Sequence, residues 1–285
     1  MRFTNKMNLN PALFASLTEQ RYFNDSDTSV TSLISPPRII QLQDRHNDEI
    51  VEDASDRIWS LLGTIGHSII EQRHVPDGIT EERLRVDING WEIGAKPDLY
   101  EGDETLSDYK FTSVWSYVFG VKPEHEKQLN MYAFFYRDAG FTVSKLQVVM
   151  IFRDWSRMKA LSGGNYPSHQ IKIVPIPVWE PEVAKAFLVT RVSLHQLAVG
   201  MQDDELPECA PEERWAKPTK YALMKEGRKS AVRVFDKKDH ARKALSLVTK
   251  PKLHYIAERP GEDTRCEHYC SVAPFCNQFI ELKEG

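Results

Sequence analysis

Apolar and polar residues alternate through residues 83–113, "RLRVDINGWEIGAKPDLYEGDETLSDYKFTS". A period of two is typical of half-buried strands, and the pattern breaks at Asn89–Gly90 and again at Glu101–Gly102–Asp103. Asn-Gly is the commonest signal of a tight hairpin turn. The pattern therefore predicts three short strands joined by two turns.

Within this pattern, Asp98 ends one predicted strand and Asp108 lies on the next. Residues two apart on a strand point to the same side, so Asp108 and Lys110 should share a face, with Tyr109 on the other. Two carboxylates on neighbouring strands could bind one cation. The alternative is an exposed ion pair on an edge hairpin.

An earlier stretch has the 3.6-residue period of an amphipathic helix and predicts one from Asp48 to Arg73. His67 lies off its apolar stripe, and Gly63, one turn earlier, leaves space where the imidazole would point. A solvated histidine is the alternative. The predicted apolar stripe comprises Ile50, Val51, Ala54, Ile58, Leu61, Leu62, Ile65 and Ile69.

A second helix is predicted from Glu124 to Ala139, where Gly140 can end it. Gln128 and Tyr132 are four residues apart and share a face of this helix. The surrounding pattern predicts a break at Pro36–Pro37 that leads into a helix, within 30–46. It also predicts strands at 145–155 and 171–179 and a final helix at 180–201. This order predicts an α/β (mixed α+β) fold with a central mixed sheet flanked by helices.

The chain has 285 residues, of which 41% are hydrophobic, enough to bury a large core. No apolar run approaches the roughly 18 residues that cross a bilayer, and the first residues do not resemble a signal peptide. We therefore expect a cytoplasmic protein without a membrane partner. We expect the chain to divide into a core at 1–205 and a smaller α+β module at 206–285.

Charge is distributed unevenly along the chain. The net charge is −4, but the segment from Arg214 to Lys252 holds thirteen basic and three acidic residues, which leaves 24 basic and 38 acidic elsewhere. A basic segment on an acidic body suggests a polyanionic partner such as DNA, and a solvated basic face is the alternative. The residues expected to bind DNA are Lys225, Arg228, Lys229 and Arg233.

Four motifs in this order resemble the RecB-like branch of the PD-(D/E)XK nuclease superfamily, most of all its phage-encoded and CRISPR-associated exonucleases. They are Gly63 to His67, Asp98 in "AKPDLY", Asp108-Tyr109-Lys110, and Gln128 to Tyr132. The resemblance implies the PD-(D/E)XK core and a metal-dependent nuclease. It also implies the backbone carbonyl of Tyr109 as a metal ligand.

The same residues suit phosphodiester hydrolysis on chemical grounds. Asp98 and Asp108 offer the hard oxygen ligands that Mg²⁺ or Mn²⁺ prefers, and His67 adds a nitrogen. Lys110 could orient the attacking water and offset charge in the transition state. Gln128 and Tyr132 would contact the scissile phosphate or position Lys110; their alternative is an ordinary helix surface.

Three cysteines lie within eleven residues, "CEHYCSVAPFC", and Cys209 is the fourth in the chain. Clustered thiols in a reducing compartment indicate metal ligands or chance proximity. Similar RecB-like nucleases carry a [4Fe–4S] cluster on C-terminal cysteines. Zn²⁺, with His254 or His268 as a substitute ligand, and free thiols are the alternatives. The candidate ligands are Cys209, Cys266, Cys270 and Cys276.

The function predicted from these observations is a metal-dependent DNA exonuclease in phage or bacterial recombination, repair or CRISPR adaptation. The alternatives are a catalytically idle DNA-binding or assembly subunit with the same fold, and an endonuclease. The expected partners are DNA ends, single-stranded or unwound, and recombination or CRISPR adaptation proteins; self-association into a homo-oligomer is also open.

Overall fold

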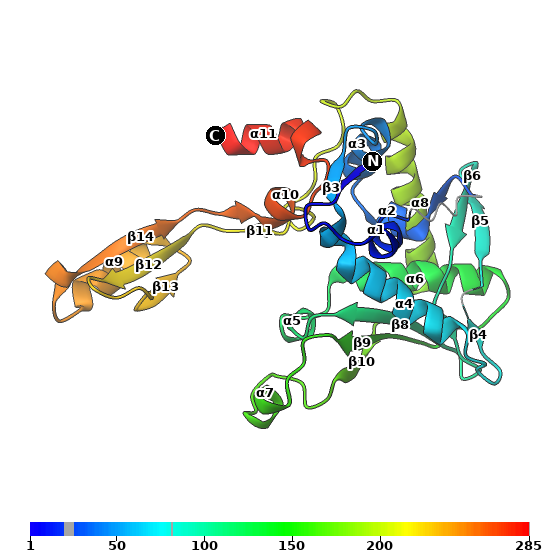
Figure 1. The fold of residues 1–285 in the computed structure, drawn as a ribbon, viewed down its shortest axis with the longest axis horizontal. Helices are drawn as coiled ribbons and strands as arrows, with labels where there is room; N and C mark the ends of the chain where they lie inside the picture. Colours follow the sequence, from blue (N-terminus) through cyan, green and yellow to red (C-terminus); the bar gives the residue numbers. More distant parts are fainter. Residues whose placement is uncertain (20–25, 81, 285) are drawn as a thin grey trace. The chain divides into compact units, whose positions relative to one another are not determined.

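The computed structural model describes residues 1–19, 26–80 and 82–284, and the chain divides into two compact units. Unit 1 is Met1–Met201 and unit 2 is Gln202–Gly285, where the sequence predicts a boundary after residue 205. Figure 1 shows the elements of both units in chain order, from blue to red. The described chain is mixed α/β, with several separate sheets.

A five-stranded mixed sheet forms the centre of unit 1, in the order β10-β9-β8-β7-β4. β8 and β9 are parallel, and the other neighbours are antiparallel. The strands are β4 (Ile79–Thr80), β7 (Leu99–Tyr100), β8 (Thr105–Thr112), β9 (Lys145–Phe152) and β10 (Ile171–Ile176). β9 buries alternate residues, as a strand covered on one face should.

A smaller sheet, in the order β2-β6-β5, holds the first predicted hairpin. Asn89 and Gly90 both have positive φ angles, 53° and 78°, as a two-residue hairpin turn requires. The strands are β2 (Thr28–Ser29), β5 (Leu84–Ile88) and β6 (Trp91–Ala95), and β1 (Arg2–Thr4) pairs with β3 (Val51–Asp53) elsewhere in unit 1.

The prediction of three strands between residues 83 and 113 is wrong, because the structure has four in two different sheets. The middle strand is divided between Ala95 and Leu99, around Pro97. Proline has no N–H to donate to a strand neighbour, so the chain leaves one sheet there and enters the other.

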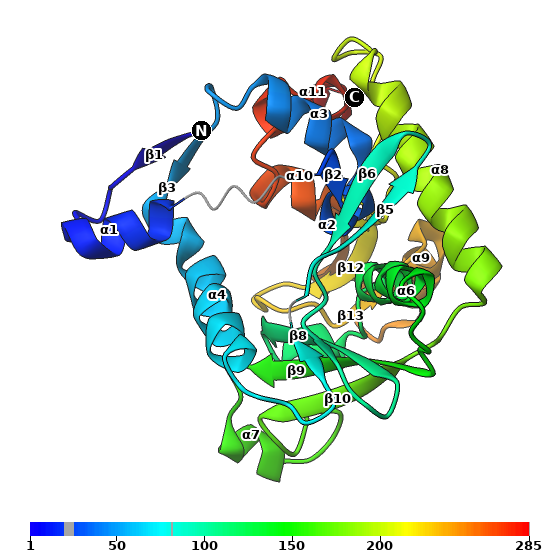
Figure 2. The ribbon, with the colours of Figure 1, turned by 90° about the vertical axis from the view of Figure 1, so that its right-hand side faces the viewer.

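The helices of unit 1 pack around these sheets, and α6 follows the predicted helix closely, ending before Gly140 with a φ of 91°. Figure 2 views α6 nearly along its axis. The helices are α1 (Pro11–Thr18), α2 (Val30–Ile34), α3 (Pro37–Arg45), η1 (Ala54–Arg57), α4 (Ile58–Glu71), α5 (Trp115–Val118), α6 (Pro123–Asp138), α7 (Arg157–Leu161) and α8 (Pro181–Val199).

The predicted helix from Asp48 to Arg73 begins too early, since regular α-helix starts only at Ile58. Asp53 explains the delay: its carboxylate accepts hydrogen bonds from Thr4 Oγ1 at 2.7 Å and from Ser55 Oγ at 2.6 Å. It thereby joins β3 to β1 and caps the 3₁₀ turn η1. Of the expected apolar stripe, Ile50 and Ala54 are buried, but they precede α4. No side chain of α4 itself is fully buried, and Leu62, Ile65 and Ile69 are exposed.

The core of unit 1 lies between α6 and the central sheet. α6 buries seven residues between Leu129 and Tyr136, and strands β8 and β9 contribute the side chains that face them. Buried core members from these elements are Leu106, Leu129, Met131, Ala133, Phe135, Tyr136, Leu146, Val148, Met150 and Phe152.

Unit 2 contains a three-stranded antiparallel sheet, in the order β13-β12-β14, against which α9 packs. The chain turns at Gly227, which has a φ of 76°. The elements are β11 (Ala216–Lys217), β12 (Lys220–Lys225), β13 (Arg233–Phe235), α9 (Lys238–Leu247), η2 (Pro251–Leu253), β14 (His254–Arg259), β15 (Glu262–Asp263), α10 (Thr264–His268), η3 (Ala273–Phe275) and α11 (Asn277–Glu284).

Across the described ranges of both units, none of the helices combines the length and apolar character needed to span a bilayer.

Candidate functional site

The two carboxylates come together through strand pairing in unit 1. Leu99 on β7 faces Ser107 on β8, so Asp98, just before β7, lies across from Asp108. Asp98 Oδ2 accepts a hydrogen bond of 2.6 Å from the backbone N–H of Tyr109. His67 Nδ1, on α4, lies 3.2 Å from Asp98 Oδ1. Both carboxylates and His67 therefore lie close together, as the sequence predicted.

Lys110 shares a face with Asp108, as period two requires. Its Nζ donates to Asp108 Oδ1 at 2.8 Å and lies 2.7 Å from Oδ2, where the angle does not suit a hydrogen bond. Oδ2 is thus buried without a hydrogen-bond partner among the described residues. Burial raises the pKa of Asp108 to about 6, opposed by the Lys110 ammonium and reinforced by the Asp98 charge.

α6 completes this face of the sheet. Lys110 Nζ donates to Gln128 Oε1 at 3.3 Å, and Gln128 Nε2 donates to the hydroxyl of Tyr132 at 2.9 Å. Tyr132 is 5% exposed, and burial raises the pKa of its phenol. Gln128 and Tyr132 are therefore joined to Lys110 by hydrogen bonds and do not lie on an ordinary helix surface.

His125 is a neighbour of the site that the sequence analysis missed. Burial, together with the nearby Lys110 and Lys122 ammonium groups, lowers its pKa to about 4. His125 precedes Gln128 by three residues on α6, so helical spacing was the signal that could have found it.

The opposite face of β8 packs on α4 through Phe111. A side chain at Gly66 would place its Cβ 2.1 Å from a Phe111 ring carbon, whereas a Cβ at Gly63 would meet nothing within 4 Å. The Phe111 ring also meets His67 edge-on, with centroids 5.7 Å apart. The close approach that places His67 thus depends on Gly66, while Gly63 leaves the open space that the sequence predicted.

The donor set suits a hard divalent cation. Asp108 Oδ2 is a buried carboxylate oxygen without a hydrogen bond, and the second carboxylate, Asp98, lies just before the paired strand. Such an oxygen is destabilising unless a cation lies beside it, and here the Lys110 ammonium does so at 2.7 Å. In the described part of the chain, however, no three His, Cys, Asp or Glu side chains are grouped so that they could hold a metal ion. At present the Lys110 ammonium lies at the Asp108 carboxylate.

The four cysteines all belong to unit 2, where their thiols influence one another. Burial, together with the charge of Glu213 and the other three thiols, raises the pKa of Cys209 to about 12. The pKa of Cys266 is raised to about 11, also chiefly by burial. Cys209 and Cys276 are buried, and Cys270 is partly buried. Four thiolates are the donors that a [4Fe–4S] cluster or Zn²⁺ requires, but no three of these thiols are grouped in the described residues so that they could hold a metal ion, and ligation stays a prediction.

Buried hydrogen bonds fix the backbone at Cys209. Its N–H donates to Gln278 Oε1 at 2.9 Å, and Gln278 Nε2 donates back to the Cys209 carbonyl at 3.0 Å. Arg214 Nη1 donates to the same carbonyl at 2.5 Å and its Nε to Asp263 Oδ1 at 3.0 Å. Cys209 is thereby tied to the start of α11 and to β15, the elements that flank the other cysteines.

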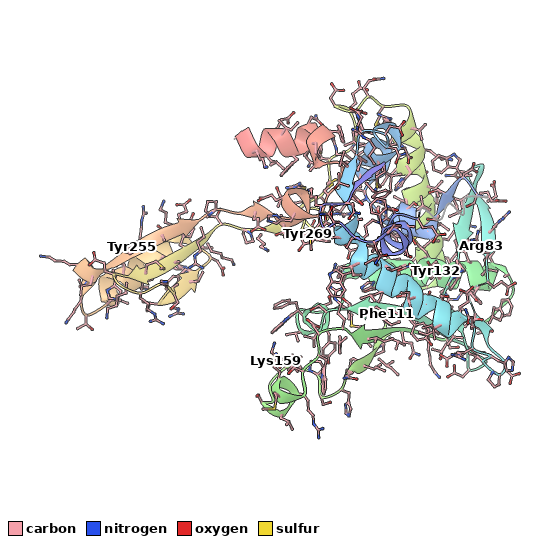
Figure 3. The ribbon with its side chains drawn as sticks, in the orientation of Figure 1. Arg83, Phe111, Tyr132, Lys159, Tyr255 and Tyr269 are labelled. Carbon is pink, nitrogen blue, oxygen red and sulfur yellow. The ribbon has the colours of Figure 1, made fainter. Side chains whose placement is uncertain are left out.

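The four residues expected to bind DNA lie on the β12–β13 hairpin of unit 2, and all are exposed. Lys225 ends β12, Arg233 begins β13, and Arg228 and Lys229 lie between them. Tyr255 on β14 faces Met224 and is 49% exposed (Figure 3). The hairpin is a basic surface, and the neighbouring strand β14 carries an accessible aromatic ring.

Comparison with known proteins leaves the family open. No protein-family model matches the sequence, and no curated protein matches it. Solved structures do match, among them "Crystal structure of SSO0001", with 18% sequence identity and a TM-score of 0.40 over 65% of this chain and 82% of that chain. Function must therefore be inferred from the residues of the site.

Proposed function

We propose that this protein is a divalent-metal-dependent deoxyribonuclease of the PD-(D/E)XK type, acting as an exonuclease on DNA ends. One observation carries the proposal: Asp98, just before β7, lies across from Asp108 on the paired strand β8, and Lys110 contacts Asp108 on the side occupied by Gln128. Two acids and a lysine at a strand end are the groups that metal-assisted phosphodiester hydrolysis needs.

Mg²⁺ or Mn²⁺ would be held by Asp98, Asp108, His67 and the backbone carbonyl of Tyr109, and would supply a water of lowered pKa and a polarised phosphate. The chain's own groups do the rest. Lys110 exchanges its contact with Asp108 for the attacking water or a phosphate oxygen, placing positive charge where negative charge develops.

Gln128 holds the Lys110 ammonium through its amide oxygen, and Tyr132 in turn fixes the amide by accepting from Nε2. This chain of hydrogen bonds sets the direction of Lys110 before substrate arrives, which lowers the ordering cost of the reaction. The raised pKa of Asp108 has a matching consequence: its negative charge is costly until a cation offsets it.

Unit 2 would supply binding and a metal cluster. The exposed cations of the β12–β13 hairpin favour contact with DNA phosphates, and the four cysteines favour a [4Fe–4S] cluster, with Zn²⁺ as the alternative. We place the protein in the cytoplasm of a bacterium or a phage-infected host, in recombination, repair or CRISPR adaptation.

Incubating the purified chain with end-labelled linear DNA, single- and double-stranded, in Mg²⁺, Mn²⁺ or EDTA tests the activity. We expect degradation from ends with either metal and none in EDTA. Circular DNA of the same sequence distinguishes the endonuclease alternative, because only an endonuclease cuts it. Tight DNA binding without hydrolysis in any metal would favour the idle subunit and refute the proposal.

A further inference from the structure

Two aromatic rings are exposed just after the end of β8 in unit 1. Trp115, the first residue of α5, is 44% exposed, and Phe119, directly after α5, is 82% exposed. Their rings stack on each other, with centroids 5.6 Å apart and planes inclined by 24°, and together they form an aromatic patch. Grouped apolar side chains on a protein surface commonly mark an interaction site.

The other side of α5 is anchored to the core. Val114 is buried, and the Tyr117 ring packs on the buried Phe152, with centroids 6.0 Å apart. Asp154 fixes the start of the helix, because its carboxylate accepts hydrogen bonds from Ser113 Oγ and from the N–H of Val114, both at 2.7 Å. Truncation of an exposed ring of the aromatic patch should therefore leave α5 in place.

Basic side chains accompany the aromatic rings in this part of unit 1. Lys159, on α7 and labelled in Figure 3, has its Nζ 5.9 Å from the centroid of Trp115. Arg153 donates its backbone N–H to the carbonyl of Thr112 at the end of β8, and its guanidinium lies 4.0 Å from the centroid of Trp59. A flat group that packs on these rings would therefore meet positive charge as well.

The charge of this surface is opposite in sign to that of the whole chain. Residues 111–121 contain no charged side chain, and residues 146–176 contain four basic residues and one acidic residue, a net +3 in a chain of net −4. The four basic residues are all exposed: Arg153, Arg157, Lys159 and Lys172. Aromatic rings combined with cations match the bases and phosphates of a nucleic acid strand.

The aromatic patch is close to the candidate site along the chain. Lys110 and Trp115 are five residues apart, and a chain of that length spans at most about 18 Å. The bases of a duplex are paired and stacked on one another, so only unpaired bases offer a free face to a protein ring. A single strand with its scissile phosphate at Lys110 could therefore place a nearby base on the aromatic patch.

We propose that the aromatic patch stacks on unpaired bases of the DNA strand that unit 1 hydrolyses. The proposal rests on the proposed nuclease function and specifies single-stranded DNA as its substrate class. A duplex and a second copy of the chain are the other occupants that this surface could take, and the experiment separates them from a single strand.

The test measures DNA binding in EDTA, where no hydrolysis occurs. The fluorescent probes are a single-stranded oligonucleotide, an abasic strand of the same length that keeps the phosphates but lacks the bases, and a blunt duplex. The variants are Trp115→Ala, Phe119→Ala, Phe119→Leu and Phe119→Tyr. Leu197→Ala, at a position 62% exposed on α8, is the control for the loss of an exposed apolar side chain. Circular dichroism verifies that each variant folds.

We expect Phe119→Ala to weaken binding of the single strand about tenfold, because it removes one stacking contact. Phe119→Leu should lose about as much, since leucine keeps apolar area but has no ring face, whereas Phe119→Tyr should bind within about twofold of wild type. The slope of log K against log salt should not change, because no phosphate contact is lost. Leu197→Ala should bind like wild type, and the abasic strand should not distinguish the variants.

Unchanged single-strand affinity in Trp115→Ala and Phe119→Ala would overturn the proposal while leaving the nuclease function standing. An equal loss for the abasic strand or for the duplex would also overturn it. Sedimentation tests the remaining occupant: a wild-type dimer that Phe119→Ala separates without a change in DNA affinity would assign the aromatic patch to self-association and overturn the proposal. Conversely, ring-dependent binding by a chain that hydrolyses no DNA with Mg²⁺ or Mn²⁺ would support the aromatic patch and refute the catalytic function.

Discussion

The carboxylate site of unit 1 and the cysteines of unit 2 are both sets of candidate metal ligands, but they are supported differently. β8 carries Asp108 and Lys110 and is paired with β9 along its whole length of eight residues. The elements next to the cysteines are short: β11 and β15 have two residues each, and α10 has five. The carboxylate site is supported by an extensive ladder of backbone hydrogen bonds, whereas the cysteines are supported by few such bonds.

This difference teaches which site depends on its ion. A sheet with its own buried core keeps its carboxylates in place whether or not a cation is bound. Short elements contribute few backbone hydrogen bonds, so metal ligation would add directly to the folding free energy of unit 2. The following changes test that contrast, from the largest expected effect to the smallest.

Lys110→Met should lower the rate of DNA hydrolysis by about 10³-fold, because it removes a charge from the transition state and leaves the sheet intact. Single-turnover degradation of end-labelled DNA measures it. Lys145→Met is the matched control, since Lys145 starts the neighbouring strand and pairs with Asp103 at 2.9 Å while remaining 63% exposed. Equal activities of the two variants would refute the role of Lys110.

Cys209→Ser should unfold the cysteine region of unit 2 but not unit 1, because it removes one of the four proposed ligands. With a [4Fe–4S] cluster, wild-type protein purified without air should be brown and contain iron and sulfide in about a 1:1 ratio. The variant should lose the colour and become protease-sensitive after about residue 205. Glu208→Gln, an exposed neighbour, is the control.

Other outcomes of the same experiment separate the alternatives. Colourless protein with stoichiometric zinc would indicate Zn²⁺, and metal-free protein of equal stability would indicate free thiols. A full cluster in Cys209→Ser would contradict ligation by Cys209.

Gly66→Ala should destabilise unit 1 by about 1–3 kcal/mol, because the new Cβ would lie 2.1 Å from the Phe111 ring. Gly63→Ala is the matched control in the same helix: its Cβ has open space, and alanine should stabilise the helix by about 1 kcal/mol. Denaturant unfolding of unit 1 measures both. A loss in Gly63→Ala as large as in Gly66→Ala would contradict the packing described here.

Acid should weaken unit 1 through His195, which is buried and whose ring Nε2 lies 3.1 Å from the Ser35 carbonyl. Burial, aided by the charge of Arg191, lowers its pKa to about 4. As pH falls below about 6.5, the unfolded chain takes up a proton that the folded chain does not. Stability is therefore lost between pH 6.5 and 4, by about 2 kcal/mol at pH 5.

Denaturant unfolding at pH 7 and pH 5 measures this loss, and His195→Gln should reduce the difference between the two. An equal difference in wild type and variant would assign the acid sensitivity to other groups.

Neutralising single residues of the unit 2 hairpin should have the smallest effect. Each of Lys225→Gln, Arg228→Gln, Lys229→Gln and Arg233→Gln should flatten the slope of log K against log salt for single-stranded DNA by about 0.7. Glu226→Gln, within the same turn, should not flatten it. Unchanged slopes in all four variants would identify the hairpin as a solvated basic face.

Local pattern was enough to predict that Asp108 and Lys110 share a strand face and that Gln128 and Tyr132 share a helix face, because strand period two and helix spacing four relate residues close in sequence. Only the resemblance to a nuclease family placed the two pairs in one site. Local pattern failed where a residue distant in the sequence determines where a helix begins. The carboxylate of Asp53 binds Thr4 and so delays the helix that its own neighbours favour.

Roles such as metal ligation and hydrolysis remain predictions, because geometry alone does not test them.

The parallel pairing of β8 with β9 also bears on when the site can form. Thr105 pairs with Lys145 and Thr112 with Phe152, so the strand that carries Asp108 and Lys110 acquires this neighbour only after some forty further residues have been added. Non-local strand pairing closes a long loop and is slow compared with helix formation. During synthesis on the ribosome, the growing chain therefore cannot assemble the carboxylates and the lysine on a finished sheet until residue 152 has emerged, so the earlier part of the chain is made before this site exists.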